Sequence, residues 1–272
     1  MNFLKSFFTK ERGYGIAFGG GSARGLAHIG VIKFLEEKNI QITEISGTSM
    51  GAIIGAFLAI GTTSDEMQKI VREISYLQMI DFDLKNGFIK GDKIVNFLEK
   101  YFGNTQIQDL KIPLKIIATD LETGEKKVFM NGKIVDAVRA SISLPGIFGP
   151  HEIDGKFFID GGVVSNLPLE ELSTYQKIGI SALKTYNGPL VRKKKFLGFE
   201  LENGFFGMNS QILSRAFAIM MQQNEAQSIA ETHGKIQVLN FEYGELDMAD
   251  FDEVEKFIEL GYETARKNLN IK

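Results

Sequence analysis

Cysteine and tryptophan are absent from this chain of 272 residues, and histidine occurs only three times. The absence of cysteine excludes disulfide bonds, thiol catalysis and every zinc site that uses cysteine ligands. Three histidines also argue against a histidine-rich metal site. We therefore expect a protein that works without a metal ion or another cofactor.

Two further features are missing, a long hydrophobic run and an excess of positive charge. The longest apolar stretch, Met50–Gly61, has 12 residues, whereas a membrane-spanning helix needs about 20. The first residues, Met1–Gly15, lack the apolar core of a signal peptide. Lys and Arg number 31 against 34 Asp and Glu, which argues against a nucleic-acid-binding protein. We expect a soluble cytoplasmic protein that is still able to touch a membrane surface.

What the chain does contain is an alternation of short apolar strands and helical patterns. The expected strands are Tyr14–Gly20, Ile42–Ser46, Leu114–Ala118, Lys127–Met130, Phe157–Ile159, Lys177–Ala182 and Ile236–Phe241. The expected helices are Ala23–Lys38, Met50–Ile60, Ser64–Ser75, Asp92–Tyr101, Ile134–Ile142, Phe205–Glu231 and Phe251–Leu269. This alternation predicts an α/β fold with a mostly parallel central sheet flanked by helices on both faces, in one domain over residues 1–272.

The segment Gly47–Gly51 (GTSMG) matches the pattern G-x-S-x-G and lies between an expected strand and an expected buried helix. A nucleophilic serine needs a sharp turn at such a junction, and small neighbours permit the strained backbone. The N-terminus of the helix also favours negative charge that develops beside Ser49. Ser49 is therefore a candidate nucleophile; the alternative is a serine that only caps the helix.

A glycine-rich segment, Gly19–Gly25 (GGGSARG), also follows an expected strand and opens a helix. Consecutive glycines let backbone N–H groups approach an anion closely. Three interpretations stay open: a phosphate-binding loop, an oxyanion hole for acyl transfer, or a tight turn without a ligand. The dinucleotide-binding spacing G-x-G-x-x-G fails because Ser22 or Arg24 stands where a glycine is needed.

Asp160 follows an expected strand and precedes two glycines. A carboxylate at a strand end can be presented to the end of a neighbouring strand, which makes Asp160 a candidate catalytic residue. The alternative is an ordinary turn aspartate, a frequent role for this residue type. Asp154, just upstream, illustrates that role, because Asp154-Gly155 predicts a plain hairpin turn.

Taken together, three blocks resemble signature stretches of the patatin-like phospholipases: residues 19–31 (GGGSARGLAHIGV), 47–52 (GTSMGA) and 160–168 (DGGVVSNLP). Residues 118–125 and 139–150 also resemble stretches of its bacterial members. Three blocks in order are far more specific than any one alone. The resemblance covers roughly residues 15–180, and we expect residues 181–272 to complete or cap the domain.

The resemblance implies a three-layer α/β/α fold and a serine lipid acyl hydrolase that cleaves phospholipids or lysophospholipids. It implies a catalytic dyad, with Ser49 as nucleophile and Asp160 as base. An aspartate near its usual pKa of about 3.9 is a weak base. We therefore expect the structure to shield Asp160 from water and raise its pKa.

The resemblance also implies an oxyanion hole in the glycine-rich segment, held in place by Arg24. The residues expected to form it are Gly19, Gly20, Gly21 and Ser22. Many family members have a glycine where this chain has Ser22. This departure leaves open which backbone N–H groups point toward the substrate.

None of the three histidines is expected to act as a catalytic base. His233 follows Asp160, as a Ser–acid–His triad requires, but it stands near a helix end, where a histidine commonly caps. His28 is expected to support the glycine-rich segment. His151, which follows Pro150, is expected to be structural and to lie in a loop.

The segment Tyr186–Gly207 differs in composition from its surroundings and is expected to form a long loop or lid. It holds Arg192–Lys195 next to Phe196 and Phe199, and basic residues beside aromatic rings suit an anionic membrane surface. The alternative is a solvated charge run beside core aromatics. The expected partner is thus a lipid substrate at a membrane surface, with the protein cytoplasmic or peripheral.

Other functions and assemblies stay open at this stage. One is a soluble small-ester hydrolase or a transacylase that uses the same dyad. Another is a non-enzymatic lipid- or nucleotide-binding module that keeps the fold. Apolar segments prone to lie at the surface also leave a homodimer open.

Overall fold

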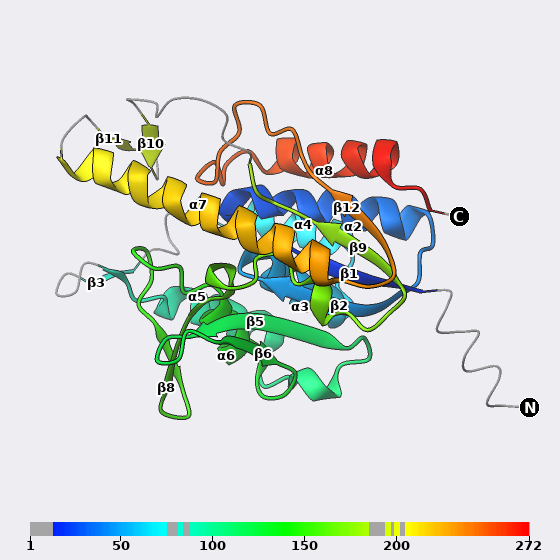
Figure 1. Cartoon of the computed structure of the whole chain (residues 1–272), viewed down its shortest axis with the longest axis horizontal. Helices are drawn as coiled ribbons and strands as arrows, with labels where there is room; N and C mark the ends of the chain where they lie inside the picture. Colours follow the sequence, from blue (N-terminus) through cyan, green and yellow to red (C-terminus); the bar gives the residue numbers. More distant parts are fainter. Residues whose placement is uncertain are drawn as a thin grey trace, which may run out of the picture.

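The computed structural model describes residues 13–74, 81–83, 88–184, 194–196, 199–201 and 205–271. Within them, eight strands form one sheet in the order β12-β9-β1-β2-β5-β8-β7, with β6 also paired to β5 (Figure 1). These strands are β1 (Tyr14–Phe18), β2 (Ile42–Thr48), β5 (Leu114–Asp120), β6 (Lys126–Phe129), β7 (His151–Ile153), β8 (Lys156–Asp160), β9 (Gln176–Ile180) and β12 (Lys235–Leu239). Strands β12 to β5 run parallel, whereas β6, β7 and β8 form an antiparallel edge.

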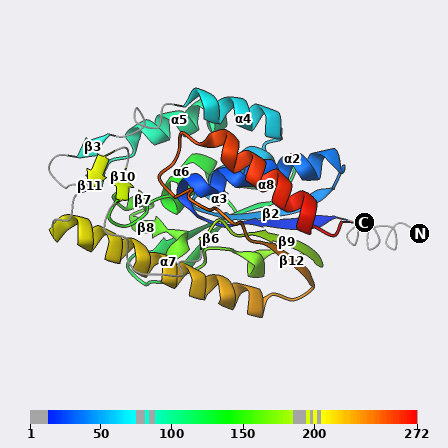
Figure 2. The same ribbon diagram turned by 90° about the horizontal axis from the view of Figure 1, so that it is seen from above.

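Helices cover both faces of this sheet, which confirms the predicted fold class. The longer ones are α2 (Ala27–Glu37), α3 (Met50–Ala59), α4 (Ser64–Glu73), α5 (Asp92–Phe102), α6 (Ile134–Ser141), α7 (Phe205–Glu231) and α8 (Val254–Asn268). Short 3₁₀ turns are η1 (Ser22–Leu26), η3 (Ile107–Asp109), η4 (Gly161–Val163) and η5 (Leu169–Glu171). Figure 2 shows α7 along one side of the sheet and α2, α3, α6 and α8 on the other.

The two faces of the sheet bury apolar cores of different size. Ile16 and Phe18 of β1 belong to a large core that includes residues of α2, α3, α6 and α8. Ala17, between them, points the other way into a small core with Leu167 and Leu169, against which Ile229 of α7 packs. This alternation is what a strand covered on both faces requires. The large core carries the hydrophobic stabilisation, while the α7 side is thinner and more polar.

Helices α2 and α8 approach one another at two glycines. A side chain at Gly30 of α2 would overlap the carbonyl of Ile258, and one at Gly261 of α8 would overlap the carbonyl of Ala27. The two backbones therefore touch directly, a closeness that only glycine permits. The contact ties the last helix of the chain to the helix that follows the glycine-rich segment.

The expected helices and strands are all present, with small shifts at their ends. Helix α4 is capped by Thr63, which forms a capping box with Glu66, one residue before the predicted start. The Asp154-Gly155 turn is confirmed, with φ of 53° and 76°, and joins β8 to β7, a strand the sequence did not predict. His151 lies in this strand, not in a loop.

The predicted lid, Tyr186–Gly207, lies mostly outside the described residues. Within it, the backbones of β10 (Lys194–Phe196) and β11 (Phe199–Leu201) pair antiparallel, as do β3 (Phe82–Asp83) and β4 (Phe88–Ile89) elsewhere. Arg192 and Lys193 are outside the described part. Among the helices that are described, none combines the length and apolar character needed to cross a membrane.

Candidate functional site

The three sequence blocks meet at one edge of the sheet. Thr48, at the end of β2, lies opposite Ile117 of β5. Asp160, at the end of β8, lies opposite Ala118, the next residue of β5. Strand β1, which leads into the glycine-rich segment, ends level with β2 on its other side. Ser49, Asp160 and the glycine-rich segment therefore come together, although Asp160 arrives on an antiparallel strand.

Ser49 stands in a strained turn between β2 and α3. Its φ of 54° and ψ of −125° put a residue with a side chain into a region that normally favours glycine. The Ser49 N–H donates to the hydroxyl of Ser141 at 2.9 Å, and its carbonyl accepts from the Ala52 N–H at 2.9 Å. Ser49 is only partly buried. This geometry is that of a nucleophile elbow, which presents a serine at the sheet edge.

The two glycines of the G-x-S-x-G pattern are required by packing. A Cβ on Gly47 would lie 2.5 Å from the carbonyl oxygen of Gly51. A Cβ on Gly51 would overlap the carbonyl of Phe18. The turn thus presses α3 against the ends of β1 and β2, and this closeness holds Ser49 beside the glycine-rich segment.

Asp160 is completely buried, with no exposed surface. Its Oδ1 accepts from the Gly162 N–H at 2.8 Å, and its backbone carbonyl accepts from the Thr119 hydroxyl at 2.9 Å. Burial raises the pKa of Asp160 to about 6, against the opposing effects of the Gly162 amide and the Ser49 hydroxyl. The expectation that Asp160 is shielded from water, with a raised pKa, is confirmed.

The contact between Ser49 and Asp160 is loose. The hydroxyl of Ser49 is close enough to lower the pKa of the carboxyl group. Even so, Oδ2 of Asp160 makes no hydrogen bond of regular geometry among the described residues. Catalytic hydrogen bonds are often long in a free enzyme and tighten when substrate binds. The two side chains are therefore neighbours without a regular hydrogen bond between them.

The glycine-rich segment directs its first N–H groups into the protein. Gly19 donates to the carbonyl of Ile180 at 2.9 Å, and Gly20 donates to the carbonyl of Asn166 at 3.2 Å. Amides that are already paired inside the protein are not free to stabilise an oxyanion. This corrects the expectation that Gly19 and Gly20 are donors. Gly21 is partly exposed, and its N–H makes no hydrogen bond within the described part of the chain.

Ser22 adopts a conformation that is unusual for a residue with a side chain. Its φ is 55°, in the left-handed region that glycine enters most easily. The segment lies directly against Ser49, because a Cβ on Gly20 would be 2.9 Å from the Cβ of Ser49. A Cβ on Gly25 would overlap the side chain of Met50. The glycine-rich segment and the turn before α3 thus pack closely, and each holds a serine with positive φ, Ser22 and Ser49.

His28 supports this segment, as expected. Its Nε2 lies 2.8 Å from the carbonyl oxygen of Gly19, and burial lowers the pKa of the ring to about 4. The histidine is therefore neutral and donates through Nε2. Arg24 is also buried, with its guanidinium over the ring of Tyr243 at 5.6 Å. Its Nε and Nη1 have no hydrogen-bond acceptor among the described residues, so its role in holding the loop stays a prediction.

His233 lies far from the site. It is exposed and follows the end of α7. The next strand, β12, starts where the Lys235 N–H donates to the carbonyl of Tyr175, just before β9. His233 therefore lies at the N-terminal ends of the parallel strands, whereas Ser49 lies at their C-terminal ends. The two ends are separated by the length of a strand, which is about 16 Å for the five residues of β9 at 3.3 Å each. The distance excludes a Ser–Asp–His triad with His233.

Three polar residues of the site were missed by the sequence analysis. The amide nitrogen of Asn166 donates to the carbonyl of Gly20 at 3.1 Å and to Glu225 of α7 at 2.7 Å. Asn224 donates to the carbonyl of Gly162 at 2.8 Å. Asn166 stands within one of the quoted blocks, so the block itself was a signal. Asn224 and Glu225 lie in a polar stretch of α7 that carries no recognisable pattern.

The described residues contain no group of three or more His, Asp or Glu side chains arranged to hold a metal ion. What the site does offer is a partly exposed serine, a buried carboxylate and, at Gly21, a backbone amide without a hydrogen bond among the described residues. These are the parts needed for nucleophilic attack on a carbonyl carbon and for stabilising the resulting oxyanion.

Comparisons with known proteins agree with this geometry. An uncharacterised NTE family protein of Mycobacterium tuberculosis is 37% identical over 161 residues, which cover 58% of this chain and 45% of that protein. The neuropathy target esterase of Drosophila persimilis is 34% identical over 163 residues, which cover 57% of this chain and 11% of that protein. The chain therefore spans less than half the length of these relatives.

Among solved structures, the fold is similar to that of VipD from Legionella pneumophila. The TM-score is 0.65 at 14% sequence identity, and the match covers 94% of this chain and 66% of VipD. A family model described as patatin-like phospholipase matches residues 16–173, which include Ser49, Asp160 and the glycine-rich segment. The chain belongs to the patatin-like phospholipase family.

Proposed function

We propose that this protein hydrolyses carboxylic esters of lipids through Ser49 and Asp160. The observation that carries this proposal is the pairing of a strained, accessible serine with a fully buried carboxylate whose pKa is raised to about 6. A base with a pKa near the working pH removes a proton more effectively than an exposed aspartate.

In the first step, Asp160 takes the proton of the Ser49 hydroxyl while Oγ attacks the ester carbonyl carbon. The tetrahedral intermediate collapses, and the leaving alcohol takes the proton from Asp160, which leaves an acyl group on Ser49. In the second step, Asp160 takes a proton from a water molecule whose oxygen attacks the acyl carbon. The carboxylic acid departs as Ser49 regains its proton.

The oxyanion of both intermediates needs donors that the protein does not use elsewhere. We assign this role to the N–H groups of Gly21 and Ser22, two partly exposed residues, in place of those of Gly19 and Gly20. The N-terminus of α3 adds a favourable field for negative charge beside Ser49. The left-handed conformation of Ser22 supports this assignment, because it turns the chain sharply where the donors must converge.

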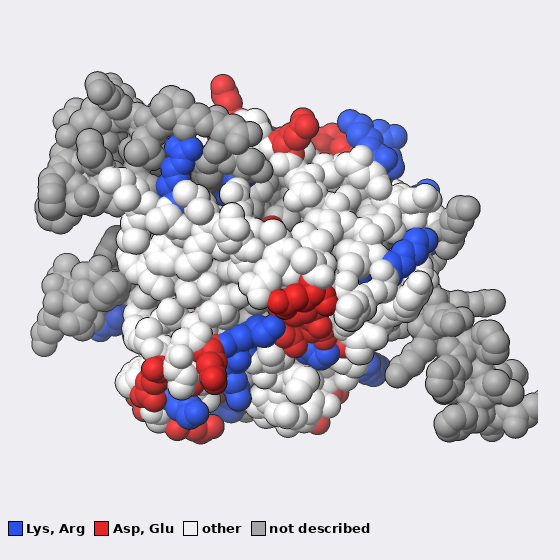
Figure 3. Space-filling model, viewed as in Figure 1, with Lys and Arg blue, Asp and Glu red and all other residues white. Residues whose placement is uncertain are grey.

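The proposed substrate is a phospholipid or lysophospholipid at a membrane surface. The family name, the name of the esterase relative and one surface feature support it. Helix α7 exposes Ile212, Leu213 and Ile219 by 49%, 49% and 54%. In Figure 3, the face over α7 carries few charged side chains, whereas acidic and basic residues gather below it. An apolar, weakly charged face suits contact with a lipid surface.

A fluorophosphonate probe tests the nucleophile directly, because such probes react with activated serines. We expect the wild-type protein to be labelled once, with the adduct on Ser49 by peptide mass spectrometry, and Ser49→Ala to remain unlabelled. An unlabelled wild-type protein of intact fold would overturn the proposal.

A substrate panel then tests the class of ester. The panel holds phospholipid vesicles, lysophospholipid micelles and a short soluble ester, each with and without an acceptor alcohol. We expect release of fatty acid from the lipids to exceed hydrolysis of the soluble ester. Preference for the soluble ester, or acyl transfer to the alcohol in place of hydrolysis, would favour the alternatives that use the same dyad.

A further inference from the structure

Glu225 is a buried carboxylate on α7 that the proposed reaction does not use. It forms no ion pair with any described residue, and Arg24 acts on it only through space. Its Oε2 accepts from the hydroxyl of Ser181 at 2.8 Å, just beyond the end of β9. Its Oε1 accepts from the amide nitrogen of Asn166 at 2.7 Å. Glu225 is thus anchored to the sheet on one side and directs Asn166 on the other.

Asn166 in turn makes two hydrogen bonds to Gly20 of the glycine-rich segment. The Gly20 N–H donates to the backbone carbonyl of Asn166 at 3.2 Å. The Gly20 carbonyl accepts from the side-chain amide of Asn166 at 3.1 Å. A Cβ on Gly20 would lie 2.9 Å from the Cβ of Ser49. The residue that Asn166 fixes therefore touches the nucleophile and directly precedes Gly21.

The orientation of the Asn166 amide depends on Glu225. Oδ1 of Asn166 has no hydrogen-bond partner among the described residues, so nothing on the oxygen side holds the group. Its nitrogen donates to two acceptors, the Gly20 carbonyl and the nearer Glu225 carboxylate. The bond to Glu225 is the shorter of the two, at 2.7 Å against 3.1 Å, and shorter bonds of this kind are the stronger ones. Glu225 is therefore the stronger determinant of the rotamer that reaches Gly20.

We propose that Glu225 is a positioning residue for catalysis, which acts through Asn166 to set Gly20 and the following N–H groups against Ser49. It touches neither Ser49 nor the substrate. The inference rests on the proposed function, since it concerns the oxyanion donors of that reaction. It gives a residue of α7 a part in catalysis, although α7 lies outside the residues that the family model matches.

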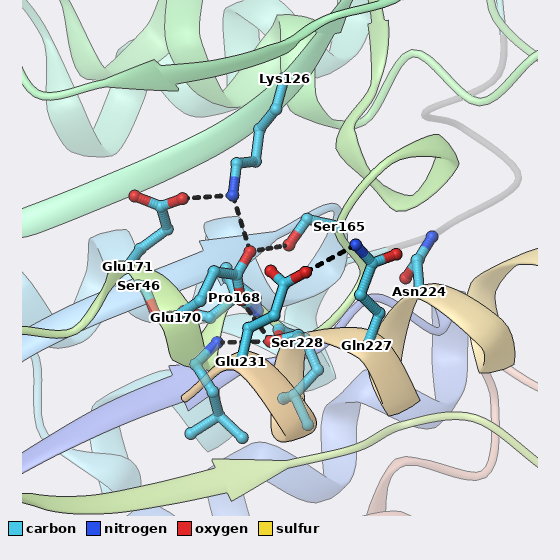
Figure 4. A network of polar contacts seen from close by, with 12 residues as sticks. Ser46, Lys126, Ser165, Pro168, Glu170, Glu171, Asn224, Gln227, Ser228 and Glu231 are labelled. Carbon is cyan, nitrogen blue, oxygen red and sulfur yellow. Dashed lines mark hydrogen bonds and ion pairs between the residues drawn. The ribbon is translucent and has the colours of Figure 1, made fainter. Parts of the chain in front are cut away.

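Glu170 of η5 provides a matched control, because it contacts the same helix, α7. Figure 4 shows its cluster, in which Glu170 contacts the hydroxyls of Ser228 and Ser165 and pairs with Lys126 at 2.8 Å. Glu170 thus fastens α7 to the loop after β8, as Glu225 does, but none of its contacts reaches the glycine-rich segment. A merely structural role for Glu225 would make the two carboxylates equivalent.

The test compares Glu225→Gln with Glu225→Asp. Glutamine keeps the length of the side chain, so its Oε1 still accepts from Asn166 and its Nε2 meets the Ser181 hydroxyl. Aspartate keeps the charge but is shorter by about 1.5 Å, so it loses Asn166 or Ser181. We expect kcat for a short soluble ester to fall by about 10- to 100-fold in Glu225→Asp, as misplaced catalytic groups typically cause. Glu225→Gln is expected to keep kcat within about threefold, with KM little changed in both.

The same substitutions at Glu170 are expected to leave kcat within about twofold of wild type. The proposal fails if Glu225→Asp keeps wild-type kcat, if Glu225→Gln loses as much as Glu225→Asp, or if Glu170→Asp loses as much kcat as Glu225→Asp. Probe labelling separates this failure from failure of the proposed function. A labelled wild-type protein with unaffected Glu225→Asp rejects only the role of Glu225, whereas an unlabelled wild-type protein rejects the function itself.

Discussion

Two carboxylates, Glu170 and Glu225, hold α7 against the loop that follows β8. Their surroundings shift their pKa values in opposite directions. Burial acts to raise the pKa of Glu170, but hydrogen bonds from Lys126 and Ser228 outweigh it and the pKa is lowered. Burial raises the pKa of Glu225 to about 7, and the hydrogen bond from Asn166 only partly opposes it. The cluster around Glu170 is therefore firmly ionised, whereas the cluster around Glu225 is not.

The difference follows the position of each carboxylate relative to Ser49. Near Ser49, buried polar groups stand without a full set of partners: Oδ2 of Asp160 and Oδ1 of Asn166 lack hydrogen bonds among the described residues. Near Glu170, the carboxylate is satisfied by an ion pair and two hydroxyls. Incomplete satisfaction lowers stability but leaves groups free to change protonation. The polar groups thus form two sets. We call the groups near Ser49 the reactive set, and the cluster around Glu170, which holds α7 in place, the fastening set.

The largest effects are expected from substitutions at the centre of the reactive set. Ser49→Ala and Asp160→Asn are each expected to lower kcat/KM by at least about 10³-fold, and the double variant is expected to be little worse than either one. Residues that act as a unit show this strong non-additivity. Glu170→Gln serves as the control and is expected to keep nearly full activity. Ester hydrolysis by Ser49→Ala near the wild-type rate would contradict the dyad.

The two carboxylates are also expected to give opposite pH dependence of stability. The folded pKa of Glu225 lies above its unfolded value of 4.5, so its contribution is present below pH 4.5 and is lost as pH rises through about 7. The wild-type protein thus loses up to about 3 kcal/mol between pH 4.5 and 8, a loss that Glu225→Gln avoids. The folded pKa of Glu170 is lowered, so its contribution is present above pH 4.5 and is lost in acid.

Urea unfolding at several pH values measures this contrast. Relative to wild type, Glu225→Gln is expected to gain stability as pH rises, whereas Glu170→Gln is expected to lose stability. The same direction for both variants would show that the two clusters are electrostatically alike.

The activity itself is expected to depend on the protonation of Asp160. Because burial raises its pKa to about 6, the base is protonated, and the reaction blocked, as pH falls below that value. We expect kcat/KM for a short soluble ester to fall about tenfold per pH unit well below pH 6. Glu170→Gln is expected to show the same acid limb. Activity that stays constant down to pH 4.5 would contradict a base with this pKa.

The smallest effect is expected at His233. It is exposed at the edge of the sheet opposite Ser49, so His233→Ala is expected to lower kcat by less than about tenfold, or roughly 1.4 kcal/mol. Steady-state kinetics on the soluble ester measure this. A loss of several thousandfold would mean that a histidine reaches the site in the working enzyme.

The sequence predicted the parts of this site that depend on local chain geometry. The G-x-S-x-G turn and the glycine-rich segment each lie at a strand–helix junction, and glycines mark such junctions because backbones approach closely there. Asp160 was found for a similar reason, since glycines follow it at a strand end. The fold class followed from the alternation of strands and helices.

The parts that escaped prediction depend on contacts between distant segments. The antiparallel direction of β8 is set by its pairing with β5 and by the hairpin to β7, which strand patterns do not reveal. The inward direction of the Gly19 and Gly20 amides depends on carbonyls of Ile180 and Asn166. Glu225 has no local signature, because glutamates are common on helices. What distinguishes it is a hydrogen bond from Asn166, which lies 59 positions away in the sequence.

The glycine contact between α2 and α8 has a consequence for how the chain folds. Helix α2 begins directly after the glycine-rich segment, and its contact with α8 forms only once the chain has been synthesised beyond Gly261. A nascent chain that ends at residue 173 would leave one side of α2 bare and the β1 edge that pairs with β9 open. Such long-range closure slows folding and exposes strand edges meanwhile. The strained turn at Ser22 is thus stabilised only after Gly261 has been synthesised.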